Sequence, residues 1–239
     1  MLEYIEKSYV GLGTINQFNI WGNNVEITLK KIVNYIYSVE QRMSYFIKTS
    51  EISKINQSAG KNYVKVSEDI FYVVKKAKEY AKITNGVFDI TARPVSDLWI
   101  EHDKTPNNYL ISKALKLINW KDILLRANAE EIMLARQGQK IDLGAIGKGF
   151  IIDEIVKILK QDKISSAIIN LGGDIFVYGN KIFKVGIQNP FSKYGESMTS
   201  IEVKNRAVAT SGIYERFNER IGQTAHHIID PRIRISGYK

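Results

Sequence analysis

The sequence predicts a single α+β domain in which helices pack on a largely antiparallel sheet. Two patterns lead to this fold class. Apolar residues recur at spacings of three and four in the first third of the chain, and short strand-like segments dominate after residue 130. Because these segments do not alternate regularly with helices, a parallel sheet of βαβ units is not expected. At 239 residues, of which 44% are hydrophobic, the chain can bury one substantial core, and we expect one domain over residues 1–239.

The first third is expected to contain an opening strand or hairpin followed by two amphipathic helices. Residues 9–21 combine strand formers with glycines, and the asparagines at 23–24 can turn the chain. A helix is predicted over residues 25–46, where the apolar positions form one stripe: Leu29, Ile32, Ile36, Val39 and Met43. Ser67 can cap a second helix that ends before Gly86.

The middle of the chain carries weaker signals. Pro94 limits regular structure, so residues 96–108 are expected to form a loop or a short helix, followed by a short helix over residues 112–117. Residues 132–134 and 140–143 are rich in strand formers and flank a Gln-Gly turn, which predicts a hairpin.

The last part of the chain is predicted to begin with a helix that ends near Gln161 and to continue as short strands. These strands are expected at residues 167–170, 175–178, 183–187, 201–203 and 207–209. They supply most of the antiparallel sheet.

The glycine-rich run over residues 140–153 is the strongest candidate for a phosphate site. It has the pattern of a strand end, a turn and a helix start, where glycines let the backbone approach a ligand and helix N–H groups attract anions. Lys148 adds a cation, and Asp142 with the carbonyls around Ala145 offers hard oxygens that suit Mg²⁺. The run is neither a P-loop nor a Rossmann fingerprint, because Phe150 stands where Ser or Thr would follow. An ordinary strand-to-helix connection is an equally good interpretation.

Four further clusters place polar groups at predicted turns or strand ends. Asp89 follows a helix end and could bind a ligand or form a turn. Residues 170–174 could admit a ligand beside their two glycines or serve only as a hairpin turn. The hydroxyls at 210–211 can donate to phosphate oxygens or form a Ser/Thr turn, and His226 or His227 could act as a general base. From the residues alone, phosphoryl or nucleotidyl chemistry with Mg²⁺ fits best.

The composition excludes several kinds of site and narrows the choice of partners. Because the chain has no cysteine, disulfides, thiolate catalysis and zinc–sulfur sites are excluded. The formal charge of +9 is spread along the sequence, so nucleic-acid binding is not expected. The N-terminus lacks the apolar core of a signal peptide, and no apolar run approaches the ~20 residues of a membrane span. We therefore expect no membrane segment and a cytoplasmic location.

Taken in order, the motifs resemble those of the ApbE family, the FAD:protein FMN transferases. The resemblance is carried by Gly-Leu-Gly-Thr at 11–14, Met-Ser-Tyr-Phe at 43–46, Phe-Asp-Ile-Thr-Ala-Arg-Pro at 88–94, Ile-Asp-Leu-Gly-Ala-Ile-Gly-Lys-Gly at 141–149, Ile-Asn-Leu-Gly-Gly-Asp at 169–174, Ala-Thr-Ser-Gly at 209–212 and His-Ile-Ile-Asp-Pro at 227–231. These segments cover nearly the whole chain. The fold that the resemblance implies is the α+β domain of that family.

The resemblance implies an enzyme that transfers FMN from FAD to a threonine hydroxyl of a target flavoprotein, with Mg²⁺ and with release of AMP. His227 would be the base toward the acceptor hydroxyl, and Ala145 would give its backbone carbonyl to Mg²⁺. Lys148 stands where the family often has an acidic residue that contacts FAD. The other residues implied to bind FAD are Met43, Asp89, Asn170, Gly172, Gly173, Asp174, Thr210 and Ser211.

The resemblance also sets expectations for the end of the chain. Family members usually continue past the His-Ile-Ile-Asp-Pro segment with a strand and a helix whose Asp and Thr hold Mg²⁺, whereas this sequence stops at Lys239. We therefore expect weak metal binding and a homo-oligomer or partner chain that completes the C-terminal strand. The alternatives are an FAD-binding homologue with little or no transferase activity, an enzyme that hydrolyses FAD to FMN and AMP, and a basic nucleic-acid binder.

Overall fold

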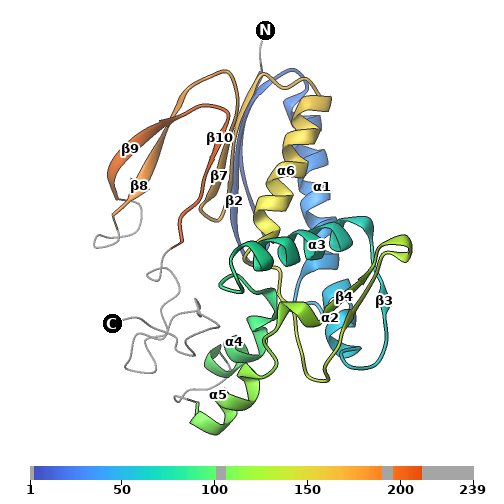
Figure 1. Ribbon diagram of the computed structural model, residues 1–239. Helices are drawn as coiled ribbons and strands as arrows, with labels where there is room; N and C mark the ends of the chain where they lie inside the picture. Colours follow the sequence, from blue (N-terminus) through green and yellow to red (C-terminus); the bar gives the residue numbers. More distant parts are fainter. Residues whose placement is uncertain (1–2, 101–105, 190–195, 212–239) are drawn as a thin grey trace. The chain divides into compact units, whose positions relative to one another are not determined.

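The computed structural model describes residues 3–100, 106–189 and 196–211 (Figure 1). Their contacts divide the chain into two compact units. The first unit takes its described residues from Met1–Glu40 and Lys148–Ser211, and we call it the sheet unit. The described residues of the second unit lie between Gln41 and Gly147, and we call it the central unit. The single domain expected from the sequence stays a prediction.

The sheet unit is built on a five-stranded antiparallel sheet with the order β1-β2-β6-β7-β10. Its strands are β1 (Glu3–Gly11), β2 (Thr14–Gly22), β6 (Ser166–Leu171), β7 (Asp174–Gly179) and β10 (Arg206–Val208). The pairs Phe18–Ile169 and Ile20–Ala167 join β2 to β6 and are fully buried. The strands that meet at the centre of the sheet therefore come from opposite ends of the described chain.

Two long helices cover one face of this sheet. They are α1 (Val25–Met43) and α6 (Gly147–Gln161), which Figure 1 shows running beside each other along the strands. Both helices bury an apolar stripe: Ile32, Ile36 and Val39 on α1, and Ile151, Ile155 and Leu159 on α6. The spacing of three and four residues that predicted these helices is thus the spacing of their buried side chains.

A two-stranded ribbon forms a second, smaller core of the sheet unit. It consists of β8 (Phe183–Gln188) and β9 (Ser197–Val203), which pair in antiparallel register. Val185 and Val203 from the ribbon bury against Val177 of β7. Val177 pairs with Ile168, next to the helix-facing Ile169, so the ribbon packs on the sheet face opposite to α1 and α6.

The central unit combines short helices with a three-stranded antiparallel sheet of order β3-β5-β4. Its helices are α2 (Glu51–Gln57), α3 (Glu68–Ile83), α4 (Arg93–Ile100) and α5 (Asn108–Leu115). Its strands are β3 (Val64–Lys65), β4 (Ile123–Arg126) and β5 (Glu131–Leu134), and single 3₁₀ turns form η1 (Ile90–Ala92), η2 (Trp120–Asp122) and η3 (Ala127–Ala129). Ile123, Ile132 and Leu134 are fully buried under these helices and strands.

The mixture of helices and antiparallel sheets confirms the predicted α+β class. The predicted hairpin of residues 132–143 is wrong, because β5 pairs with β3 and β4 while residues 140–143 belong to no strand. The prediction that Pro94 limits regular structure is also wrong. Pro94 lies in the first turn of α4, where its missing N–H costs no helical hydrogen bond. No helix in the described part of the chain is long and apolar enough to span a bilayer.

Ser67 precedes α3 as expected, but its hydroxyl does not cap the helix. The Ser67 side chain donates instead to Glu51 at 3.0 Å, and the same carboxylate accepts from the Ser67 backbone N–H at 2.7 Å. Ser67 therefore joins the start of α3 to α2 within the central unit.

Candidate functional site

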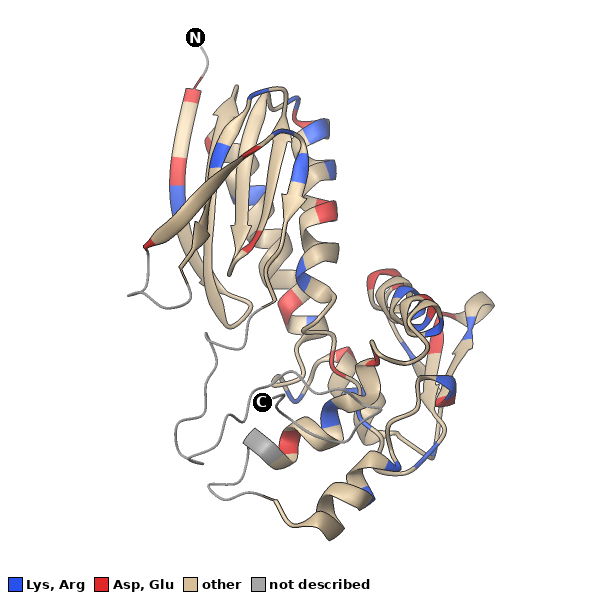
Figure 2. Ribbon diagram, turned by 60° about the vertical axis from the view of Figure 1, so that its left-hand side comes forward, with Lys and Arg blue, Asp and Glu red and all other residues tan. Residues whose placement is uncertain are grey.

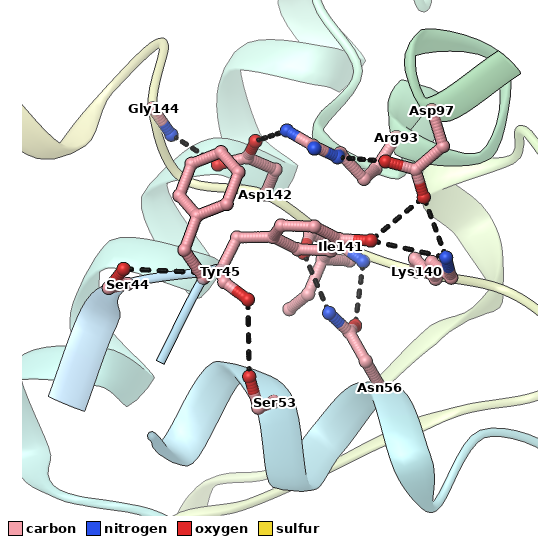
Figure 3. Close-up of polar contacts among 11 residues, drawn as sticks. Ser44, Tyr45, Ser53, Asn56, Arg93, Asp97, Lys140, Ile141, Asp142 and Gly144 are labelled. Carbon is pink, nitrogen blue, oxygen red and sulfur yellow. Dashed lines mark hydrogen bonds and ion pairs between the residues drawn. The ribbon is translucent and has the colours of Figure 1, made fainter. Parts of the chain in front are cut away.

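The glycine-rich run begins as an extended segment that is held by side chains rather than by a neighbouring strand. The backbone N–H of Ile141 donates to Asn56 Oδ1 at 2.8 Å, and Asn56 Nδ2 donates to the Ile141 carbonyl at 3.0 Å (Figure 3). The next backbone N–H, that of Asp142, donates to the carbonyl of Ile90 at 3.0 Å. Alternation of polar and apolar side chains resembled a strand here because the backbone is extended and paired, although its partner is a side chain.

A tight turn follows this segment and leads directly into α6. The turn covers Gly144, Ala145 and Ile146, and the Gly147 N–H donates to the Leu143 carbonyl at 2.7 Å. Gly144 and Ala145 are exposed, as expected for residues that could contact a ligand. Of the predicted strand end, glycine turn and helix start, the turn at residues 144–146 and the helix start at Gly147 are therefore present, whereas the strand is not.

Asp142 fixes the beginning of the turn with both of its carboxylate oxygens. Oδ1 accepts from the Gly144 N–H at 2.9 Å, and Oδ2 accepts from Arg93 Nη1 at 2.8 Å. The sequence suggests Asp142 as a source of hard oxygens for Mg²⁺. In the structure its carboxylate is already engaged by a guanidinium and a backbone amide.

Arg93 lies almost completely buried at the centre of this network, with only 8% of its side chain exposed. Its Nε donates to Asp97 Oδ1 at 2.6 Å, one helical turn along α4. Its Cζ lies 3.8 Å from the centroid of the Tyr45 ring and 5.1 Å from that of Phe46. The guanidinium thus pairs with two carboxylates in its plane and contacts aromatic rings, which is the environment that suits arginine better than lysine.

Asp97 is shared between two cations and a phenol. Its Oδ2 accepts from Lys140 Nζ at 2.6 Å and from the Tyr45 hydroxyl at 2.8 Å, as the dashed lines of Figure 3 show. Burial acts to raise the pKa of Asp97, but hydrogen bonds from Lys140 and Tyr45 and the charge of Arg93 outweigh it and lower the pKa. Asp97 is therefore ionised and binds the Lys140 end of the glycine-rich run to α4.

Asp89 has a local structural role in addition to any ligand role. Its Oδ1 accepts from the Thr91 N–H at 2.8 Å and from the Thr91 hydroxyl at 2.7 Å, and its Oδ2 accepts from the Trp120 N–H at 3.0 Å. Burial raises the pKa of Asp89 above its ordinary value, although these hydrogen bonds oppose the shift. Asp89 therefore caps η1 and connects it to η2 by hydrogen bonds. This is the turn-forming role that the sequence offers as one of two interpretations.

Met43 and Ala145 are the other predicted site residues of the central unit. Met43 is buried, and its Sδ lies 2.8 Å from the point where a Cβ on Gly147 would stand. A glycine at 147 therefore lets the end of α1 approach the start of α6. Ala145 can present only its backbone to a metal, and no group of three or more His, Asp or Glu side chains gathers within the described ranges. A cation near Ala145 would thus need oxygens from a phosphate or from water.

The remaining described candidates lie in the sheet unit around the β6–β7 hairpin. Lys148 pairs with Asp174 at 2.7 Å and approaches the Gly172 carbonyl at 3.4 Å. Asn170 Oδ1 accepts from the Gly173 N–H at 2.8 Å. Lys148 of the glycine-rich run and Asp174 of the second glycine motif are thus in direct contact within the sheet unit.

The turn of this hairpin contains two residues, Gly172 and Gly173, which both have positive φ, at 58° and 93°. Two positive φ values are typical of a type I′ turn, whose twist matches the flanking strands. Hairpin formation therefore explains both glycines without a ligand. Their role in binding FAD stays a prediction.

The remaining predicted site residues are two hydroxyl residues after β10 and the histidine expected to act as a base. Thr210 and Ser211 follow β10 in the sheet unit and are exposed. His227 lies outside the described residues, and so do His226 and the sequence that follows.

Sequence reasoning missed the residues that hold the glycine-rich run. Arg93 and Asp97 are four positions apart, a spacing that places them on one face of a helix, but Pro94 between them argued against a helix. Asn56 gave no signal, because its partner Ile141 is 85 residues away in the sequence. Figure 2 shows Lys and Arg interspersed with Asp and Glu along the helices and strands, so charge alone did not single out this network either.

Comparison with protein families and curated proteins gives consistent matches. A family model described as the ApbE family matches residues 12–236. The FAD:protein FMN transferase of Klebsiella pneumoniae is 30% identical over 216 residues, which cover 89% of this chain and 67% of that protein. The FAD:protein FMN transferase of Treponema pallidum is 29% identical over 253 residues, covering 96% and 70%. The curated relatives are longer, and a further one, from Buchnera aphidicola, is covered over only 60% of its length.

Solved structures show the same similarity in three dimensions. The crystal structure of an ApbE protein from Thermotoga maritima matches with a TM-score of 0.89 and 29% identity, covering 97% of this chain and 78% of that one. The flavin transferase ApbE of Vibrio cholerae matches with a TM-score of 0.83 over 98% of this chain and 78% of that one. At 23% identity, this second match speaks for the fold alone.

Proposed function

This chain belongs to the ApbE family, and from that premise we propose that it transfers FMN from FAD to a threonine hydroxyl of a target flavoprotein. The threonine oxygen would attack the phosphorus of the FMN half of FAD. The bond between that phosphorus and the bridging oxygen would break, and AMP would leave with the bridging oxygen. The hydroxyl proton would pass to a base on the enzyme.

The observation that carries this proposal is the match of the ApbE family model to residues 12–236. The similar curated proteins of Klebsiella pneumoniae and Treponema pallidum are named FAD:protein FMN transferases. The geometry of the glycine-rich run supports it. A turn with exposed backbone leads into α6, a helix of 15 residues, and the first N–H groups of such a helix attract phosphate oxygens.

We propose roles for the candidates of each unit toward FAD and the metal. In the central unit, Met43 and Asp89 would contact the flavin nucleotide and Ala145 would offer its carbonyl to Mg²⁺. In the sheet unit, Lys148 and the hydroxyls of Thr210 and Ser211 would contact FAD, together with the β6–β7 turn formed by Asn170, Gly172, Gly173 and Asp174. Bound Mg²⁺ would neutralise charge that develops on the diphosphate.

His227 would accept the proton of the acceptor hydroxyl. A neutral imidazole has a pKa near the working pH, which suits this role. A charged Lys148 would stabilise negative charge on the phosphate without taking part in proton transfer.

The experiment is incubation of the protein with FAD, Mg²⁺ and a threonine-bearing acceptor, followed by mass spectrometry of the acceptor. We expect the acceptor to gain one FMN and AMP to appear in equal amount. His227→Gln should abolish the gain while FAD still binds. An acceptor that never gains FMN, at any Mg²⁺ concentration, would contradict the proposal.

Two controls in the same experiment separate the alternatives. AMP that forms without an acceptor would indicate hydrolysis of FAD, in which water replaces the threonine. FAD binding without AMP release, and without a response to Mg²⁺, would indicate a binding homologue.

A further inference from the structure

The extended segment before the glycine turn depends on side chains at three successive points. Lys140 is bound by Asp97, Ile141 by Asn56, and Asp142 by Arg93 and the Ile90 carbonyl. A strand within a sheet would be held in place by a series of backbone hydrogen bonds to its neighbour. Here a few hydrogen bonds hold the whole segment, so the loss of one partner should move the turn.

Arg93 has the central place among these contacts. It is the only described side chain that binds both Asp97 and Asp142, at 2.6 and 2.8 Å. Through Asp142 it acts on Gly144, because the second oxygen of the same carboxylate accepts the Gly144 N–H. Arg93 is thus two contacts away from Ala145 and never needs to touch a ligand itself.

The fork of the guanidinium explains why this position needs arginine. Two separate N–H groups, Nε and Nη1, reach two carboxylates while the flat face stays on the Tyr45 ring. A lysine would supply the charge, but its donors sit on a single nitrogen, without the fork and without the planar contact. The geometry at Asp142 therefore requires the shape of arginine as well as its charge.

The charge of Arg93 has a second consequence for an anionic ligand. Asp142 stands two residues before Gly144, and without Arg93 its carboxylate would present an unbalanced negative charge at the start of the turn. Such a charge would repel a diphosphate. The buried charge of Arg93 offsets this negative charge.

We infer that Arg93 is a positioning residue for the proposed transfer: it holds and neutralises Asp142, which in turn sets the Gly144–Ala145 turn for binding the diphosphate of FAD. This inference rests on the proposed function. It adds to that function a residue that lies in the segment 88–94 but is not among the residues expected to touch FAD.

The test compares three variants with the wild type in FAD titrations and in amide exchange of Gly144 measured by NMR. Arg93→Lys keeps the charge and loses the fork. Asp142→Asn keeps an oxygen for Gly144 but sets an amide against Arg93. The double variant Arg93→Met, Asp142→Asn removes both charges and keeps the oxygen, and replacement of a buried ion pair by a matched neutral pair is often tolerated.

We expect each single variant to weaken FAD binding about tenfold and to speed amide exchange at Gly144, as for loss of one charge-assisted hydrogen bond. The double variant should bind FAD more tightly than either single variant but less tightly than the wild type, because it restores the charge balance and not the hold on residue 142. Arg126→Met is the matched control, because Arg126 also stacks on a tyrosine, at 3.7 Å from Tyr63, and pairs with Glu131 at 3.3 Å. Arg126→Met should change neither the affinity for FAD nor the amide exchange at Gly144.

Two results would overturn the inference. In one, the single variants melt at lower temperature yet keep wild-type FAD affinity and wild-type exchange at Gly144, which would make Arg93 a purely structural residue. In the other, the double variant binds FAD as weakly as the single ones. If the wild type itself binds no FAD, the proposed function fails, and exchange at Gly144 still decides whether Arg93 sets the turn.

Discussion

Asn56 pairs with Ile141 as a neighbouring strand would, donating from Nδ2 at 3.0 Å and accepting at Oδ1 at 2.8 Å. One side chain thereby satisfies both backbone groups of a buried residue. This pairing explains how an extended segment can lie in the central unit without joining its sheet.

Asn56→Ala should lower the free energy of unfolding by about 2 kcal/mol, because two hydrogen bonds to buried backbone groups are lost at roughly 1 kcal/mol each. Urea unfolding would measure it. The neighbouring Gln57→Ala is the control, since Gln57 makes a long, exposed hydrogen bond of 3.4 Å to Lys48. A loss in Asn56→Ala no larger than that in Gln57→Ala would contradict the pairing.

The ionised state of Asp97 predicts a pH-dependent contribution to stability. A carboxyl whose folded pKa is lowered stabilises the protein above its unfolded pKa, and this contribution is lost as the pH falls through the folded pKa. The wild type should therefore exceed Asp97→Asn in stability by the most at neutral pH. The difference should shrink below about pH 4.

Thermal or urea unfolding of both proteins from about pH 3 to about pH 7 would measure this difference in the free energy of unfolding. Glu202→Gln, on the exposed strand β9, should show no comparable change with pH. A constant difference between wild type and Asp97→Asn would argue that Asp97 contributes by packing alone.

Gly172→Ala should destabilise the protein more than Gly173→Ala. Both substitutions put alanine at a positive φ, but only a Cβ at 172 would meet another residue, Thr14, with Oγ1 at 2.5 Å. We expect this overlap to lower the free energy of unfolding of Gly172→Ala by about 1–3 kcal/mol more than that of Gly173→Ala. The extra loss should fall in a Thr14→Ala background, and the same loss in both backgrounds would be evidence against the contact.

Gly149→Ala should make the protein more stable by about 0.5–1 kcal/mol, because alanine favours helix and no described atom lies within 4 Å of the added Cβ. If glycine serves here to let FAD approach α6, the same variant should bind FAD less tightly. Gly147→Ala should show no such gain in stability, since its Cβ would meet Met43 Sδ. A more stable Gly149→Ala with unchanged FAD affinity would show that the absence of a side chain at 149 has no part in binding FAD.

The helices and most strands could be predicted because their signals are local. The buried stripe of α1 is present in the sequence as apolar residues three and four apart, and the β6–β7 hairpin is marked by two adjacent glycines between apolar runs. Residues 140–143 carry a similar local signal, yet their hydrogen bonds go to Asn56 and Ile90. Local alternation reports an extended backbone and not the identity of its partner.

The network around Arg93 could not be predicted for the same reason. Its members come from the loop that follows α1, from α4 and from the glycine-rich run, and only the fold brings them together. The sequence also left open a loop or a short helix after Pro94 and missed that the helix begins at Arg93, because the rule against proline does not apply in a first turn. The motifs indicated where a ligand could bind, and the structure adds what holds those motifs.

The pairing of β2 with β6 has a consequence for how the chain is synthesised. Residues 3–22 can form the β1–β2 hairpin early, but the strand that covers the open edge of β2 begins at Ser166. At a usual rate of translation, the ribosome needs on the order of 10 s to make the stretch between them. During that interval the whole central segment, residues 41–147, can emerge and fold, while the nascent hairpin keeps an unpaired edge that a chaperone or another nascent chain could bind.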